Sequence, residues 1–179
     1  RTRRDLIERL AVPPDRIAVV YPGSDPAHVP PIPEARRAAR AALGVSDARP
    51  IVAFVGALGA DDTKGLGTLL AAWARLARRP EWQGLLAIAG TGPRLSQWRV
   101  ETTRLGLDAS VRFLGFTRDV PALFAAADLL VAPSRYEAYG VAVHEALGCG
   151  LPAIVSAHAG IAERCVPELA PLLLEDPSD

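Results

Sequence analysis

The sequence lacks methionine altogether and contains a single lysine, Lys64, among its 20 basic residues, so the other 19 are arginines. Because translation starts at methionine, we expect these 179 residues to be a piece of a longer polypeptide. A chain that uses arginine almost everywhere and keeps one lysine suggests that a compact ammonium is required at that position. Lys64 is therefore a candidate binding residue.

Other shortages exclude whole classes of protein. The formal net charge is zero, which argues against a nucleic-acid partner held by a basic surface. No apolar run approaches the roughly 18 residues of a transmembrane helix, and no signal-peptide core follows the basic N-terminus. Two cysteines, Cys149 and Cys165, are too few for a disulfide framework or a zinc site. We predict a cytoplasmic protein with reduced thiols and no bound metal.

The pattern of apolar runs and breakers predicts an α/β fold, a Rossmann-like parallel sheet with helices on both faces. Residues 1–33 are expected to be the end of an N-terminal domain region, with a short helix and a strand, followed by a stiff interdomain connection with five prolines between 22 and 33. Residues 34–179 are expected to form the domain proper, with its last layer unfinished and one more helix in the intact protein. The expected strands are 16–21, 51–55, 85–89, 111–114, 128–132 and 153–156, and the expected helices are 2–10, 34–43, 66–78, 94–105, one from 121 and one from 140.

The segment 128–150 is the most informative part of the chain. A buried strand leads into a loop with Ser134 and Glu137, and Gly140 precedes a helix that contains Glu145. The free N–H groups at such a helix start can bind an anion, and they include that of Val141. Ligands of open parallel sheets lie beyond the carboxyl ends of the strands. The layout therefore predicts phosphate on the amides and sugar hydroxyls on the two carboxylates.

Two further loops follow strands and could reach the same place. The first begins at Gly56 and ends with Lys64 before a helix, but no Ser or Thr follows the lysine, so it is not a Walker A loop. The second contains Gly90 and Gly92, which either bring the backbone close to a ligand or form a tight turn. The remaining candidates are weaker: Gly160 and Glu163 could line the cleft, whereas His28, His144 and the three tryptophans 73, 82 and 98 more simply serve packing.

At this point the motifs resemble those of a known family. Val20-Tyr-Pro-Gly-Ser-Asp25, Val55-Gly-Ala-Leu58 with Lys64-Gly65, Ala89-Gly-Thr-Gly-Pro93, Val111-Arg-Phe-Leu-Gly115 and the segment from Ala127 to Pro152 follow one another in register. The chain resembles the C-terminal, nucleotide-sugar-binding domain of retaining GT-B glycosyltransferases of the family 4 type. The resemblance covers nearly the whole sequence.

The resemblance implies specific roles. Lys64, Gly140 and Val141 would bind the donor diphosphate, Glu145 the ribose hydroxyls, and Glu137 would lie against the donor sugar. The residues around Phe113 to Phe116, Phe113 and Leu114 among them, would border the base, and Glu137 and Lys64 would be the catalytic residues. One departure is that Ala57 stands where the family usually has an arginine, so Arg118, Arg135 or a residue outside this chain would have to replace that cation. The full set of donor-binding residues implied is Gly56, Lys64, Gly90, Gly92, Phe113, Leu114, Ser134, Gly140, Val141 and Glu145.

The implied activity is transfer of a sugar from a nucleoside diphosphate (UDP-, GDP- or ADP-sugar) to an acceptor sugar, lipid or small molecule, with retention of configuration and without a cofactor or metal. The acceptor site would belong to an N-terminal domain outside this chain, so the fragment alone is expected to be inactive. That domain could also bring the enzyme to the inner face of a membrane. Two other interpretations stay open: a sugar-nucleotide epimerase of the same architecture, and a non-catalytic nucleotide-sugar-binding module.

Overall fold

The protein is built around a six-stranded parallel sheet with the strand order β3-β2-β1-β4-β5-β6. A computed structural model describes residues 2–23, 25 and 28–177. In chain order the strands are β1 (Ile51–Val55), β2 (Leu85–Ala89), β3 (Val111–Gly115), β4 (Leu129–Ala132), β5 (Ala153–Ser156) and β6 (Leu173–Leu174). The first five match the predicted ranges closely. The sixth strand was not predicted, because the short run Leu172–Leu174 shows no alternation of apolar and polar residues that would indicate a strand.

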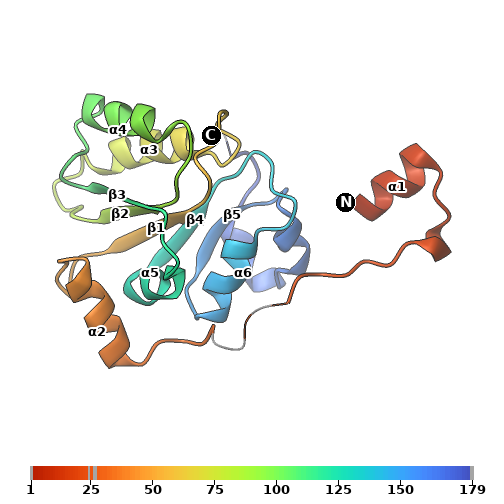
Figure 1. Ribbon diagram of the computed structural model, residues 1–179, viewed down its shortest axis with the longest axis horizontal. Helices are drawn as coiled ribbons and strands as arrows, with labels where there is room; N and C mark the ends of the chain where they lie inside the picture. The colour runs from red at the N-terminus through yellow and green to blue at the C-terminus, as the bar shows by residue number, and fades with distance from the viewer. Residues whose placement is uncertain (1, 24, 26–27, 178–179) are drawn as a thin grey trace.

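Helices cover both faces of this sheet, as predicted (Figure 1). On one face, α3 (Leu66–Leu76) and α4 (Leu95–Arg104) bury Trp73 and Trp98 against alternate residues of β1 and β2. On the other face, α5 (Val120–Ala126) and α6 (Val141–Gly148) bury Phe124 and Val143. The two cores are separate because successive side chains of a strand point to opposite faces.

The helices begin and end where local chemistry requires. Asp119 accepts a hydrogen bond from the backbone N–H of Ala122 at 3.1 Å and so caps α5, with proline in the first turn. Helix α2 (Pro33–Ala42) is followed by Gly44, which has the left-handed φ of +60° expected of a residue just past a helix end. Both features were readable from the sequence.

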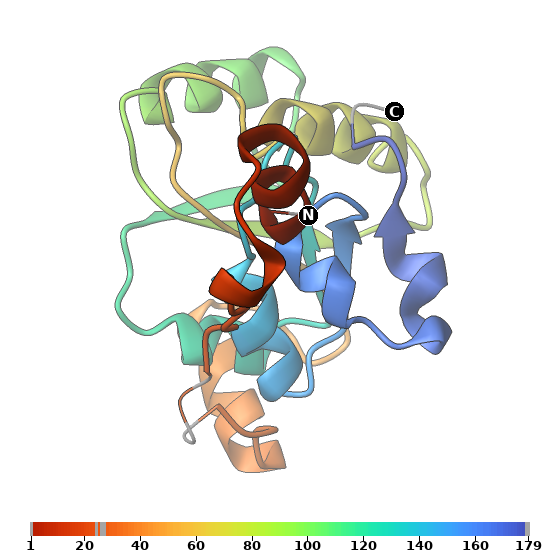
Figure 2. The same cartoon turned by 90° about the vertical axis from the view of Figure 1, so that its right-hand side faces the viewer.

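The N-terminal region departs from prediction in one element. Helix α1 (Thr2–Leu10) forms as expected, but the predicted strand 16–21 is wrong: a 3-10 turn, η1 (Pro14–Arg16), leads into chain that joins no sheet. A strand needs a partner for its backbone groups, and none of the six strands pairs with this stretch. Figure 1 shows α1 standing apart from the sheet and its helices, joined to them by the connection that precedes α2, and Figure 2, viewed from that side, shows it in front of the domain.

The chain beyond β5 forms short turns rather than a long helix. Two 3-10 segments, η2 (Gly160–Arg164) and η3 (Pro167–Leu172), lead to β6, which pairs in parallel with the end of β5.

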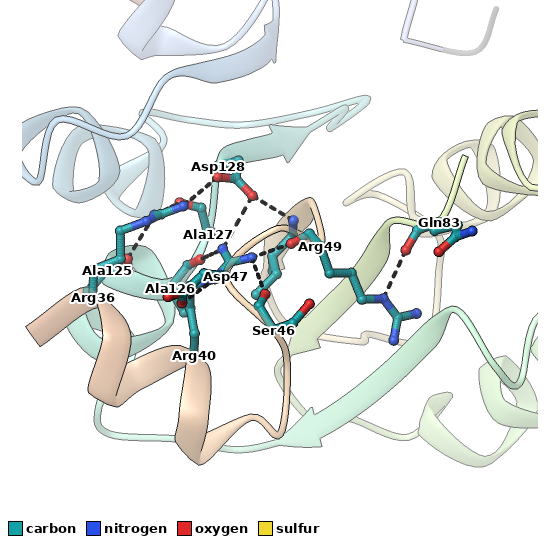
Figure 3. Close-up of polar contacts among 11 residues, drawn as sticks. Arg36, Arg40, Ser46, Asp47, Arg49, Gln83, Ala125, Ala126, Ala127 and Asp128 are labelled. Atoms are coloured by element: carbon teal, nitrogen blue, oxygen red, sulfur yellow. Dashed lines mark hydrogen bonds and ion pairs between the residues drawn. The ribbon is translucent and has the colours of Figure 1, made fainter. Parts of the chain in front are cut away.

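A cluster of arginines joins α2 to the amino ends of the central strands (Figure 3). Arg40 is 2% exposed, and its guanidinium donates to the carbonyls of Ala126 at 2.7 Å and Ser46 at 2.9 Å, and to that of Arg49. Arg36 pairs with Asp128 at 2.5 Å, and the same carboxylate accepts from the N–H of Ile51 at 2.7 Å. The starts of β1 and β4 are thereby locked to α2 and to each other.

Candidate functional site

The strand order places a candidate site at the carboxyl ends of β1 and β4. From β1 the chain moves outward through β2 and β3, then returns to the opposite side of β1 to form β4 and β5. At such a switch point the loops after neighbouring strands diverge to opposite faces and leave a crevice. The two loops that meet here are 56–65, which holds Lys64, and 133–140, which holds Glu137.

Lys64 and Glu137 form a direct ion pair across this crevice. The Nζ atom of Lys64 lies 2.6 Å from Oε2 of Glu137, and the side chains are 33% and 22% exposed. The loops are also tied through their backbones, because the N–H of Arg135 donates to the carbonyl of Thr63 at 2.8 Å. The structure thus brings together, from residues 73 positions apart, the two side chains predicted to be catalytic.

The N-terminus of α6 opens beside this pair. Gly140 adopts a φ of +105°, no side chain caps the helix, and the first intrahelical bond runs from the N–H of His144 to the carbonyl of Gly140. The amides of the first turn, including Val141, therefore have no partner within the helix. Free amides and the positive end of the helix dipole favour an oxyanion at this point.

The first turn of helix α3 does not offer its amides to a ligand in the same way. The carboxylate of Asp62 accepts hydrogen bonds from the N–H of Gly67 at 3.1 and 3.2 Å and so occupies the first turn. Asp62 was not among the predicted residues, although an aspartate shortly before a helix is an ordinary capping signal. Its carboxylate leaves no room for a second anion at the amide of Gly67.

Glu145 lies in α6, half-buried, one turn beyond the open N-terminus. Within the described part of the chain it makes no ion pair, in contrast to Glu137. Burial raises the pKa of the Cys149 thiol, and the nearby negative charge of Glu145 raises it further. The two predicted carboxylates thus have different environments: Glu137 is neutralised by Lys64, and Glu145 is available to accept hydrogen bonds.

The glycines at positions 90 and 92 are explained by packing between loops. A Cβ on Gly90, whose φ is +147°, would lie 1.9 Å from the carbonyl oxygen of Gly56, and one on Gly92 would lie 2.1 Å from that of Leu58. The N–H of Leu58 donates to the carbonyl of Thr91 at 3.0 Å, which joins the same two loops. These glycines shape the loop that carries Lys64, and their predicted contact with the donor stays a prediction.

Some of the side chains predicted to border a base pack against the hydrophobic cores, and others are exposed to solvent. Phe113 packs against the core under α3 and α4, and Leu114 against the core under α5 and α6. Just past the strand, Phe116 is 72% exposed. Ser134, in contrast, is buried at the end of β4. Phe116 is therefore the aromatic ring of this loop that solvent reaches most easily.

The weaker candidates take structural roles. The Nδ1 atom of His144 lies 3.1 Å from the hydroxyl of Tyr139, and His28 contacts Gly148 at the far end of α6. A Cβ on Gly160 would lie 2.2 Å from the carbonyl oxygen of Ala138, so this glycine lets the loops after β4 and β5 meet. The tryptophans pack: Trp73 and Trp98 are in the core, and the ring of Trp82 lies 5.6 Å from that of Trp73.

Among the described residues, no helix is long and apolar enough to cross a bilayer. Within the same residues, no three His, Cys, Asp or Glu side chains gather where they could hold a metal ion. The described residues of the crevice include one ammonium, one open helix N-terminus and two carboxylates. Such a set suits a ligand that carries both phosphate and hydroxyl groups.

Comparison with known proteins agrees with this geometry. Residues 49–179 match the model of the family "Glycosyl transferases group 1". The D-inositol 3-phosphate glycosyltransferase of Corynebacterium efficiens is 35% identical over 165 residues, which cover 88% of this chain and 38% of that protein. The chain therefore spans less than half the length of this relative.

Two solved structures share the fold. Anabaena HepE in complex with UDP-glucose superposes with a TM-score of 0.83 at 26% identity, covering 99% of this chain and 49% of that one. WaaG, a glycosyltransferase involved in lipopolysaccharide biosynthesis, superposes with a TM-score of 0.80 at 28% identity, covering 90% of this chain and 43% of its own. The chain belongs to the group 1 glycosyltransferases and has the fold of the C-terminal, nucleotide-sugar-binding domain of their GT-B architecture.

Proposed function

We propose that this chain is the donor-binding half of a retaining glycosyltransferase that uses a uridine diphosphate sugar. The observation that carries the proposal is the Lys64–Glu137 pair, 2.6 Å apart, beside the open N-terminus of α6. Support for uridine comes from the similar HepE, whose structures contain UDP and UDP-glucose. The acceptor, a sugar, lipid or small molecule, would bind with the help of chain beyond this fragment.

The proposed reaction breaks the bond between the anomeric carbon and the β-phosphate oxygen of the donor. Negative charge develops on the leaving diphosphate, where the ammonium of Lys64 and the amides at the start of α6 can stabilise it. Glu137 faces the donor sugar and Glu145 accepts hydrogen bonds from the ribose hydroxyls. The hydroxyl oxygen of the acceptor bonds to the anomeric carbon on the face that the diphosphate leaves, and the hydroxyl proton passes to the departing phosphate oxygen, so the configuration is retained.

The charges of the site suggest modest donor affinity in the isolated chain. Glu137 already neutralises Lys64, and Ala57 stands in the first loop where the family usually supplies an arginine. The diphosphate would therefore contact the N-terminus of α6 and the ammonium of Lys64, which also pairs with Glu137. We propose that the intact protein supplies the remaining positive charge and that the reaction takes place in the cytoplasm, where nucleotide sugars are present.

A thermal-shift comparison tests the proposal. A ligand that binds only the folded state raises the unfolding temperature, and the rise grows with the logarithm of its concentration relative to its dissociation constant. We expect UDP and UDP-glucose to raise the melting temperature of the chain, and uridine, which has no phosphate, to leave it nearly unchanged. GDP and ADP serve as base controls. Equal shifts with UDP and uridine would contradict a diphosphate site at α6.

A further inference from the structure

One aromatic residue beside the donor site, Tyr139, is not used by the mechanism above. It lies in the loop 133–140, between Glu137 and Gly140, the residue that precedes α6. Its ring is half-buried and packs against the core under α5 and α6. This packing suits a residue that holds its neighbours in place rather than one that touches a substrate.

The backbone of this loop is fixed as far as Tyr139. The N–H of Gly160 donates to the carbonyl of Glu137 at 3.2 Å, and the N–H of Ile161 donates to the carbonyl of Tyr139 at 2.6 Å. Both donors belong to η2, so the loop after β4 is tied to the chain that follows β5. The side chain of Glu137 therefore starts from an anchored backbone.

Gly140 separates this anchored loop from the helix whose amides are proposed to hold the diphosphate. Its φ of +105° is one that other residues rarely adopt, and glycine has the widest range of backbone angles. A rotation at Gly140 would change the direction of the first turn of α6 relative to Glu137 and Lys64. A diphosphate that contacts both Lys64 and the amides needs this direction to be fixed.

The side chain of Tyr139 bridges this glycine. Its hydroxyl lies 3.1 Å from Nδ1 of His144, the residue whose N–H makes the first intrahelical bond to the carbonyl of Gly140. The two rings meet edge to face, with centroids 5.7 Å apart and planes at 73°. The anchored loop is thereby joined to the first turn of α6 through side chains as well as through the backbone of Gly140.

A second aromatic ring, that of Tyr21, supports Tyr139 from the N-terminal connection. The centroids of the two rings are 6.0 Å apart, with their planes tilted by 41°. The hydroxyl of Tyr21 donates to Glu163 at 3.3 Å, and the guanidinium of Arg164 lies 4.9 Å from the centre of its ring. Tyr21 is thus held on η2, and the position of the connection that contains it bears on Tyr139.

We infer that Tyr139 is a positioning residue for the donor diphosphate. Through its hydrogen bond to His144 it sets the direction of the first turn of α6, and the ring of Tyr21 holds it in place. Donors that are fixed before the ligand arrives bind it more tightly, because less freedom is lost on binding. This inference rests on the proposed function, because it assumes that the amides of α6 bind the β-phosphate.

Calorimetric affinities of UDP and UMP for the whole chain test the inference. UMP lacks the β-phosphate, so only the affinity for UDP should depend on the start of α6. Tyr139→Phe keeps the ring and removes the hydroxyl, and we expect the ratio of UDP to UMP affinity to fall by about two- to tenfold, as for one neutral hydrogen bond. Tyr136→Phe, on the same loop at a residue that is 71% exposed, is the matched control and should keep the wild-type ratio.

Two more positions locate the effect. His144→Leu removes the partner of the hydroxyl and should lower the ratio as Tyr139→Phe does. The double variant should lose no more than either single variant, because both substitutions remove the same hydrogen bond. Tyr21→Leu removes the supporting ring and should lower the ratio while leaving the affinity for UMP nearly unchanged.

The outcomes separate the inference from the proposed function. If the wild-type chain binds UDP and Tyr139→Phe keeps the wild-type ratio, the inference fails and the proposed function stands. Equal losses for UDP and UMP would also overturn the inference, because the hydroxyl would then stabilise the domain as a whole. Additive losses in the double variant would contradict the route through His144, and a wild-type ratio in Tyr21→Leu would contradict the support by that ring. If UDP does not bind the wild-type chain, the proposed function fails and the inference with it.

Discussion

The buried arginine of α2 should be among the most sensitive positions in the molecule. Arg40→Ala removes a guanidinium that is 2% exposed and donates to the carbonyls of Ala126, Ser46 and Arg49. Each abandoned carbonyl loses a bond to a charged donor, and the neighbouring Asp128 loses a cation 3.5 Å away. Removing one member of a buried charged network typically costs about 3–5 kcal/mol. Against a typical total of roughly 5–15 kcal/mol, this is a large fraction of the free energy of unfolding.

Chemical denaturation of the variant and two comparisons would measure this effect. Arg37→Ala, one residue along the helix from Arg36, removes a 58% exposed side chain that pairs with Glu34, so we expect the free energy of unfolding to change by about 0.5 kcal/mol or less. Asp128→Asn keeps an acceptor for the N–H of Ile51, and its side chain is partly exposed, so we expect the free energy of unfolding to fall by about 1–2 kcal/mol. If Arg40→Ala is no more destabilising than Arg37→Ala, the role given to the cluster in Figure 3 is wrong.

Three further predictions concern the loops and the site. Gly65→Ala places a Cβ 2.0 Å from the carbonyl oxygen of Pro133 at a φ of +73°, whereas the Cβ of Gly44→Ala, at a φ of +60°, meets nothing within 4 Å. Chemical denaturation should show Gly65→Ala to be less stable than Gly44→Ala by about 1–3 kcal/mol. Equal losses of stability in the two variants would contradict the contact with Pro133. Glu137→Gln frees Lys64 of its counter-charge, so calorimetry should find tighter UDP binding, and weaker binding would place Glu137 in direct support of the diphosphate. Burial and the charge of Glu145 raise the pKa of the Cys149 thiol, so less thiolate exists at a given pH, and alkylation of Cys149 should begin at a higher pH than alkylation of a small-molecule thiol. Glu145→Gln should lower the pH at which alkylation begins. An unchanged pH would contradict the electrostatic effect of Glu145 on Cys149.

Much of the fold could be predicted because its signals are local. The runs Ile51–Val55 and Leu85–Ala89 are short, apolar and bounded by glycine or proline, and both became central strands. The segment at 16–21 has an equally good strand pattern but lies in no sheet, since strand pairing depends on a partner that a pattern does not supply. Leu173–Leu174 shows the opposite case, because a two-residue strand exists only through its pairing with β5.

The sequence could indicate which residues lie near the candidate site, but not which of them contact one another. Loops that follow parallel strands gather at one edge of the sheet, and this rule alone brought Lys64 and Glu137 into the same region. That they pair directly depends on β1 and β4 being neighbours, and the strand order is a long-range property. The functions of Gly90 and Gly92 were hidden for the same reason: the atoms that exclude a side chain belong to the loop that starts at Gly56.

Lys64 and the start of α6 are proposed to hold the β-phosphate of a nucleoside diphosphate. Calorimetric affinities of UDP and UMP, measured for the wild-type chain and for Lys64→Ala, test this assignment. Because a hydrogen bond to a charged group is worth about 1.5–3 kcal/mol, we expect UDP to bind the wild-type chain at least tenfold more tightly than UMP. Lys64→Ala should abolish most of that ratio while changing UMP affinity little. An unchanged ratio in Lys64→Ala would contradict the assignment of Lys64 to the diphosphate.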